Sequence, residues 1–126
     1  FLLMDCDHFK EINDTFGHLI GDQILEHIGR SLKLTFRSTD IIGRIGGDEF
    51  CVYMKDIPSA DFVQGKCLQL RSLIRTASED ISVSVSTGIA FVEGEMAYEC
   101  IFKMADDALY QAKRNGRDQA AVYGGR

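Results

Sequence analysis

The chain has 126 residues, 45% of them hydrophobic, which suffices for one domain with a substantial core. Its 14 basic and 19 acidic residues give a net charge of -5, which argues against a general surface for nucleic acid or for an anionic membrane, so no nucleic-acid partner is expected. No apolar run approaches the roughly 18 residues of a membrane span and no signal-peptide pattern opens the chain, so the sequence predicts a cytoplasmic domain.

The first half of the chain predicts a strand, a helix and a hairpin. The stretch "FLLM" is short and continuously apolar, as in a strand buried on both faces, and it runs directly into Asp5 and Asp7. A helix is predicted from Gly21 by apolar residues at helical spacing, which are Leu25, Ile28, Leu32 and Phe36. A hairpin around Gly46 and Gly47 follows, since hairpin turns use glycine at positive φ.

The second half predicts two further helices and two strands. Ser59 can cap a helix whose apolar stripe comprises Phe62, Val63, Cys67, Leu70, Ile74 and Ala77. The alternating stretch "ISVSVSTGIAF" predicts a strand with Ile81, Val83, Val85, Ile89 and Phe91 on one face. A last helix carries Tyr98, Ile101, Phe102, Ala105, Ala108, Leu109 and Ala112 and ends at Asn115-Gly116, before a closing strand "AAVY".

The predicted order β-α-β-β-α-β-α-β indicates an α+β fold with a central antiparallel sheet and helices packed on it, close to the ferredoxin-like pattern. The chain contains no repeat and no internal linker, so residues 1–126 are treated as one domain. Four cysteines lie widely spaced in apolar patterns without any C-x-x-C, which predicts reduced core thiols: Cys6, Cys51, Cys67 and Cys100. Because "FLLMD" begins within an apolar strand, we expect the chain to be part of a longer protein.

The stretch "RIGGDEF", residues 44–50, places two carboxylates directly after two glycines. If the first strand lies beside this hairpin, Asp5, Asp48 and Glu49 converge, and their mutual repulsion requires cations. Oxygen ligands of this kind suit Mg²⁺ or Mn²⁺ rather than Zn²⁺. Gly46 and Gly47, which lack side chains, would let a phosphate-bearing ligand approach the backbone. From the hairpin alone, a solvated acidic turn is an equally good interpretation.

Three segments closely resemble the signature segments of the GGDEF-domain diguanylate cyclases: "DCDHFKEINDTFGHLIGDQIL", "RIGGDEF" and "ADDALYQAKRNGRDQ". The resemblance spans nearly the whole chain and implies a palm-type relative of the predicted fold. It implies an enzyme that condenses two GTP molecules into cyclic di-GMP with release of pyrophosphate. The near-match "GRIGG" lacks the G-x-G-x-x-G spacing, so a dinucleotide-binding fingerprint is rejected.

The resemblance also implies a role for individual residues. Asp5 and Asp48 match metal ligands, the carbonyl of Cys6 matches a backbone ligand, and Glu49 matches an acidic residue that the family requires for activity. The other matches concern GTP: Asn13 and Asp22 at guanine, Phe9, Lys10, Gly46 and Gly47 at the phosphates, His18 in support of the loop, and Lys113 and Arg117 at the triphosphate. Without the resemblance, most of these are ordinary helix-end, turn or core residues.

The chemistry of guanine supports the match at Asp22. A carboxylate accepts hydrogen bonds from both N1–H and the 2-amino group of guanine, whereas adenine offers no such donor pair. The implied reaction uses two Mg²⁺ or Mn²⁺ ions per active site, an attacking 3′-hydroxyl and pyrophosphate as leaving group. Because one domain binds one GTP, two domains must face each other in a two-fold homodimer.

A further match is "RSTD", in which Arg37 and Asp40 stand at the offset of the family's R-x-x-D product-inhibition site. Arginine can bind a phosphate and stack on a purine, and aspartate can accept from guanine. The resemblance thus implies that cyclic di-GMP binds here and inhibits the enzyme. Taken alone, the two residues would form a solvated helix end.

Two other functions stay open. One is a catalytically inert module that binds GTP or a cyclic dinucleotide and regulates a partner. The other is an enzyme that makes a mixed guanine and adenine dinucleotide, although relatives of that kind alter the position of Asp22. The family's N-terminal helix with its "D-x-L-T" turn is absent here, and an upstream sensory or regulatory domain is expected in the full-length protein. Whether that protein has a membrane anchor stays open.

Overall fold

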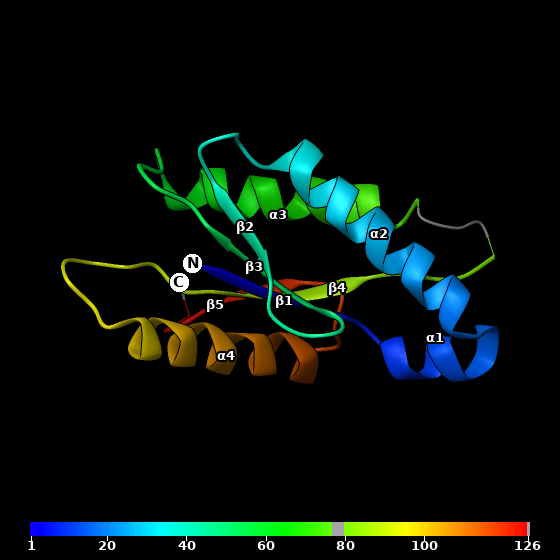
Figure 1. Ribbon diagram of the computed structural model, residues 1–126. Helices are drawn as coiled ribbons and strands as arrows, with labels where there is room; N and C mark the ends of the chain where they lie inside the picture. The colour runs from blue at the N-terminus through cyan, green and yellow to red at the C-terminus, as the bar shows by residue number, and fades with distance from the viewer. Residues whose placement is uncertain (77–79, 126) are drawn as a thin grey trace.

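The computed structural model describes residues 1–76 and 80–125 (Figure 1). Its elements are β1 (Leu2–Cys6), α1 (Phe9–Phe16), α2 (His18–Thr35), β2 (Ile41–Arg44), β3 (Glu49–Tyr53), α3 (Ala60–Ile74), β4 (Val85–Ile89), α4 (Tyr98–Arg114) and β5 (Ala120–Val122). The α+β class and the order of elements are therefore as predicted, except that two consecutive helices stand where the sequence predicted one.

The five strands form one sheet in the order β2-β3-β1-β4-β5. β1 lies in the middle and pairs antiparallel with both β3 and β4, which explains why "FLLM" is apolar without alternation. The hairpin strands β2 and β3 are antiparallel. The sheet departs from the antiparallel prediction only at one edge, where β5 runs parallel to β4 because α4 crosses over between them.

Helices cover both faces of the sheet. In Figure 1, α2 and α3 lie on one side and α4 lies on the other. The larger core cluster includes Leu2, Ile28 and Leu70, all at most 1% exposed. On the α4 side, Gly88 permits a very close approach, because a Cβ there would stand 2.1 Å from the carbonyl oxygen of Ala105.

The helix α1 was not predicted. Its eight residues contain a single buried position, Ile12, so the apolar periodicity is too sparse to signal a helix. Gly17, with φ 90°, ends α1 and precedes α2, which begins at His18 instead of Gly21. The corner between these helices forms one end of the candidate site.

The other boundaries largely follow the predictions. Ser59 caps α3 by accepting a hydrogen bond from the amide of Phe62, and Gly116 adopts φ 115° just after α4. β4 begins at Val85 and is shorter than the alternating stretch suggested, although Val83 is still buried in the same core. Ala77, predicted on the stripe of α3, lies outside the described residues.

All four cysteines are free thiols, as predicted, but Cys100 is exposed on α4 and Cys51 is only half-buried. Cys6 and Cys67 are buried in the main core. No helix in the described part of the chain combines the length and apolarity needed to cross a membrane.

Candidate active site at the carboxylate end of the sheet

The central strand brings its terminal carboxylate next to the acidic pair of the hairpin. Asp5 is paired in register with Glu49 on β3. The next backbone amide, that of Cys6, donates to the carbonyl oxygen of Asp48 at 3.2 Å. The strand and the hairpin therefore lie side by side, which is the condition under which the sequence predicted a convergence of Asp5, Asp48 and Glu49.

The raised pKa values of Asp48 and Glu49 indicate that the three carboxylates lie close to one another. Burial is the main cause that raises the pKa of Asp48 from 3.8 to about 6. The Asp5 carboxyl adds to this rise through a hydrogen bond and through its charge, and Lys113 partly opposes it. Burial, followed by the charges of Asp5 and Asp106, also raises the pKa of Glu49. Negative charge is thus costly at this edge, and a cation placed there would relieve the cost.

One cation of the chain already lies in the cluster. Lys113, near the C-terminal end of α4, places its Nζ 2.5 Å from Oδ2 of Asp5, although the two residues are 108 positions apart. Lys113, which the resemblance assigned to the triphosphate, therefore lies beside the carboxylates in the structure. The contact is shielded, since the Asp5 side chain is 17% exposed.

The donor set suits a hard metal ion. Oδ1 of Asp5 is buried and has no hydrogen-bond partner, so one carboxylate oxygen remains available. The thiol of Cys6 is unsuitable as a ligand because burial, then the charges of Asp48, Asp7 and Asp5, raise its pKa to about 12. Only its backbone carbonyl oxygen is a candidate.

Across residues 1–76 and 80–125, no three side chains of His, Cys, Asp or Glu form a ready-made metal site. Mg²⁺ is commonly held by one or two carboxylates, with waters and substrate phosphates completing its shell. The pair Asp5 and Asp48 fits that pattern better than a closed protein cage would.

The glycines of the hairpin are not there for backbone freedom. Neither Gly46 nor Gly47 adopts a positive φ, contrary to the usual reason for glycine in a hairpin. A Cβ on Gly47 would meet nothing within 4 Å, and one on Gly46 would meet only Cβ of Glu49 at 3.9 Å. The fold itself would accept alanine at both positions, so the space beside the carboxylates is open to a ligand.

Arg44 fixes the shape of this turn and was missed by the sequence analysis. Its Nε donates to the carbonyl oxygens of Gly46 and Gly47, both at 3.1 Å, and its Nη2 donates to that of Gly47 at 2.6 Å. From the sequence alone, an arginine four residues before two carboxylates would be interpreted as a surface charge. No pattern in the sequence indicates that its side chain binds backbone carbonyl groups.

The predicted guanine residues lie around the corner of α1 and α2. Oδ1 of Asn13 is buried without a hydrogen-bond partner, and a Cβ on Gly21 would come within 1.9 Å of it. Phe9 is packed on the same glycine, with Cζ 3.2 Å from that position. Asp22 follows Gly21 and is exposed. Gly21 therefore leaves room for the side chain of Asn13 at this corner.

Three other predicted residues are exposed. Lys10 lies on α1 and His18 is the first residue of α2. Arg117 lies in the turn after α4, with φ 64° and an amide that donates to the carbonyl oxygen of Ala112 at 3.0 Å. The structure does not show these side chains in contact with the carboxylate cluster.

Arg37 and Asp40 do come together, but they bind each other. Nη2 of Arg37 donates to Oδ1 of Asp40 at 2.8 Å, and the backbone amide of Arg37 donates to Oδ2 at 2.8 Å. Nη2 also reaches the carbonyl oxygen of Lys55 at 2.7 Å. The Asp40 side chain is fully buried, so a ligand would have to displace Arg37 before reaching that carboxylate.

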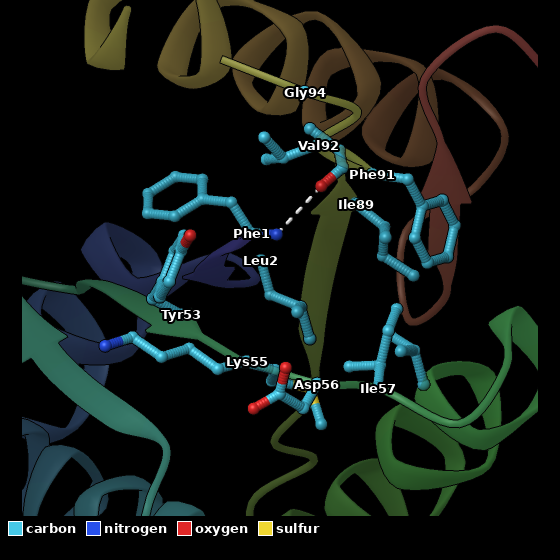
Figure 2. A pocket seen from close by; sticks show the side chains of 13 residues that line it. Phe1, Leu2, Tyr53, Lys55, Asp56, Ile57, Ile89, Phe91, Val92 and Gly94 are labelled. Carbon is cyan, nitrogen blue, oxygen red and sulfur yellow. Dashed lines mark hydrogen bonds between the residues drawn. The ribbon is translucent and has the colours of Figure 1, made fainter. Parts of the chain in front are cut away.

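A separate pocket of about 350 Å³ lies at the other end of the sheet, around the start of β1 (Figure 2). Figure 2 shows the amino group of Phe1 bonded to the carbonyl oxygen of Ala90, with Tyr53 and Phe91 among the side chains around the pocket. Every residue that lines it lies outside the predicted site. This pocket is therefore not the place where the carboxylates act.

Taken together, the fold and the site define a class of α+β domains in which a central strand and a hairpin present carboxylates at one sheet edge. The sequence matches the family described as "Diguanylate cyclase, GGDEF domain" over residues 1–119. The chain belongs to this GGDEF domain family.

Relatives and solved structures agree with that membership. The chain is 42% identical over 127 residues to diguanylate cyclase DgcP of Pseudomonas aeruginosa, covering 95% of this chain and 18% of that protein. It is 38% identical to the probable diguanylate cyclase DgcC of Escherichia coli, covering 96% of this chain and 34% of that protein. The chain thus spans about a fifth to a third of the length of these relatives.

Among solved structures, the GGDEF domain of DgcB from Caulobacter crescentus in complex with c-di-GMP superimposes with a TM-score of 0.87 at 26% identity, covering 97% of this chain and 75% of that one. The active GGEEF domain of a diguanylate cyclase from Vibrio cholerae gives a TM-score of 0.86 at 29% identity, covering 99% of this chain and 82% of that one. The α+β fold is therefore the fold of the family.

Proposed function

We propose that residues 1–126 act as the catalytic GGDEF domain of a diguanylate cyclase, which condenses two GTP molecules into cyclic di-GMP and releases pyrophosphate. The observation that supports this most strongly is the carboxylate edge itself. Asp5, Asp48 and Glu49 converge there with Lys113, beside two glycines that the fold does not require. The raised pKa of Asp48 and the unpartnered buried oxygen of Asp5 support a site that binds a ligand there.

In this proposal the carboxylates of Asp5 and Asp48 and the carbonyl of Cys6 hold the divalent ions, with Mg²⁺ or Mn²⁺ as the expected metal and two ions per active site. When bound, these ions neutralise the triphosphate and lower the pKa of the attacking 3′-hydroxyl. Glu49 contributes negative charge next to the same site. Lys113 and Arg117 supply positive charge to the phosphates, and Lys113 must leave Asp5 at least partly to do so.

The base and the proximal phosphates are assigned to the other predicted residues. Asp22 accepts from N1–H and the 2-amino group of guanine, and the unpartnered Oδ1 of Asn13 is a second acceptor close by. The amides around Phe9 and Lys10 and the open backbone at Gly46 and Gly47 face the phosphates. His18 supports the loop at the start of α2. Such a donor and acceptor set prefers guanine over adenine.

The product requires two nucleotides, so we propose that two copies of the domain meet in a two-fold arrangement, each 3′-hydroxyl attacking the α-phosphate held by the other copy. The relatives that the chain matches are about three to nearly six times as long, which supports an additional regulatory segment in the full-length protein. Because GTP is a cytoplasmic nucleotide, we place the reaction in the cytoplasm.

We further propose that cyclic di-GMP inhibits the enzyme by binding at Arg37 and Asp40. The domain of DgcB that was solved with c-di-GMP shows that a member of this family binds the product. In the present chain, Arg37 must exchange its bonds to Asp40 for bonds to a phosphate of the ligand, which frees the Asp40 carboxylate for guanine.

The purified chain, incubated with Mg²⁺ and with GTP, ATP or both, tests the proposal. Separation of the products by chromatography should show cyclic di-GMP from GTP and nothing from ATP alone. Binding of GTP without turnover would instead indicate an inert regulatory module. A mixed guanine and adenine product would show that Asp22 does not set the base preference.

A further inference from the structure

Asp7 is a buried carboxylate that the proposed reaction does not use. It is 5% exposed, and its two oxygens accept three hydrogen bonds. The hydroxyl of Ser86 binds Oδ1 at 2.6 Å, whereas the hydroxyl of Ser84 at 2.6 Å and the amide of Asp118 at 3.0 Å bind Oδ2. In the described part of the chain no cation forms an ion pair with it. Neutral donors alone thus hold this carboxylate at the end of β1.

The bond to Asp118 joins two distant parts of the site. Asp7 follows the metal-ligand candidates Asp5 and Cys6, and Asp118 lies 111 positions later, directly after Arg117. Arg117 and Asp118 both adopt the left-handed conformation, with φ 64° and 47°. Consecutive residues other than glycine persist there only when their surroundings hold them. The amide that Asp7 binds belongs to this turn.

Other contacts hold the same turn from its outer side. Nη2 of Arg75 donates to Oδ2 of Asp118 at 2.5 Å, and the side-chain amide of Gln119 donates to the carbonyl oxygen of Arg117 at 3.0 Å. These contacts are exposed, whereas the bond from the Asp118 amide to Asp7 is partly buried and ends on a carboxylate, so solvent screens it less.

We propose that Asp7 is a positioning residue for the triphosphate: its carboxylate fixes the left-handed turn at Arg117 and Asp118, and so keeps the Arg117 side chain directed at the phosphates. The inference rests on the proposed function, because it takes GTP as the ligand and Arg117 as one of its phosphate contacts. Asp7 itself touches neither substrate nor metal in this arrangement.

The proposal is testable because Asp7 is charged. An electrostatic effect of Asp7 and a positioning effect would change the affinity for GTP in opposite directions. Replacing Asp7 by asparagine removes a negative charge near the site of a polyanion, which by electrostatics alone should tighten binding of GTP. Asparagine keeps only one acceptor oxygen for three donors and carries no charge, so the bond from the Asp118 amide should weaken, release the turn and weaken binding. Asp7→Asn also keeps the size of the side chain, so that packing changes little.

The experiment measures the affinity of the 126-residue chain for α,β-methylene GTP and for GMP in Mg²⁺ by calorimetry. Asp7→Asn should weaken binding of the triphosphate about tenfold and change that of GMP less than twofold. In an Arg117→Ala background, the same replacement should have less than a twofold effect on either ligand, because Asp7 acts through Arg117. Ser86→Ala, which removes a donor from the oxygen that does not bind the turn, is the matched control and should leave the ratio of the two affinities unchanged.

Equal losses for both nucleotides, an undiminished loss in the Arg117→Ala background, or tighter binding of the triphosphate would each overturn the proposal. If Asp7→Asn does not fold, Asp118→Ala tests the turn itself: it keeps the amide that binds Asp7, but it removes a negative charge and the side-chain contact with Arg75 that helps to hold the turn. It should weaken binding of the triphosphate, and a gain in affinity would contradict the proposal. Failure of the unmodified chain to bind the triphosphate at all would refute the proposed function instead.

Discussion

Replacing Asp48 by asparagine should stabilise the chain at neutral pH when divalent metal is absent, even though the same replacement should abolish catalysis. Asp48 carries a carboxyl whose pKa is raised from 3.8 to about 6 by burial and by Asp5. A carboxyl whose pKa rises on folding favours the folded state while it is protonated. That contribution is complete below about pH 3.8, declines as the pH rises, and is lost above about pH 6.

The size of the effect follows from the same pKa. One unit of pKa displacement corresponds to about 1.36 kcal/mol, so a fully shielded group at this pKa would cost about 3 kcal/mol at neutral pH. Asp48 is partly exposed, and screening by solvent reduces the cost to roughly 1 to 1.5 kcal/mol. Asparagine is neutral at every pH and can still donate to Asp5, so Asp48→Asn should recover this amount at pH 7.5.

Urea denaturation in the presence of a chelator, at pH 4.5 and pH 7.5, measures the difference. The variant should exceed the wild-type chain in free energy of unfolding at pH 7.5 and lose most of this advantage at pH 4.5. Glu95→Gln, an exposed carboxylate remote from the site, is the control and should show no such dependence. If Asp48→Asn is less stable at pH 7.5, or equally affected at both pH values, the carboxylates do not crowd one another as the structure indicates.

Four further predictions concern the site and its support. Glu49→Ala should abolish formation of cyclic di-GMP with little change in thermal unfolding, because Glu49 is the partly exposed first residue of β3; full turnover would refute its role. Asp22→Ala should weaken GTP binding by about 1.5 to 3 kcal/mol in calorimetry and relax discrimination against ATP, and an unchanged affinity would contradict the assignment. Arg37→Ala should retain basal turnover and lose inhibition by added cyclic di-GMP, and persistent inhibition would show that the product binds elsewhere. Gly47→Ala should leave the free energy of unfolding in urea within about 0.5 kcal/mol of wild type yet weaken GTP binding. Gly88→Ala should instead cost about 3 kcal/mol of stability, since its Cβ meets the backbone of α4; equal effects of the two replacements would contradict the account of the hairpin glycines.

Much of the fold could be predicted because its signals are local. The continuous apolar run "FLLM" indicates a strand buried on both faces, and Ser59 and Gly116 mark helix ends by capping chemistry. The alternation in "ISVSVSTGIAF" predicted a single buried face, but all five residues of β4 are buried because helices cover both sides of the sheet (Figure 1). The helix α1 lacked such a signal, since it buries one residue. The parallel pairing of β5 depends on the crossover of α4 and cannot be read from the three residues of the strand.

The site could be predicted in part for the same reason. The convergence of Asp5 with Asp48 and Glu49 needed only the assumption that two predicted strands are neighbours. The contact of Lys113 with Asp5 and that of Asp7 with Asp118 join residues more than 100 positions apart, so periodicity and spacing do not reveal them. The pairing of Arg37 with Asp40 depends on side-chain geometry within a short turn, which spacing alone does not determine.

The dependence of initial rate on protein concentration tests the central claim most directly. The purified chain, supplied with Mg²⁺ and saturating GTP, should form cyclic di-GMP and release two pyrophosphates for each product molecule. Because two copies must meet, the rate should rise with the square of protein concentration in the dilute range. Consumption of GTP in linear proportion to protein, without any cyclic dinucleotide, would contradict the assignment of this carboxylate edge as a diguanylate cyclase site.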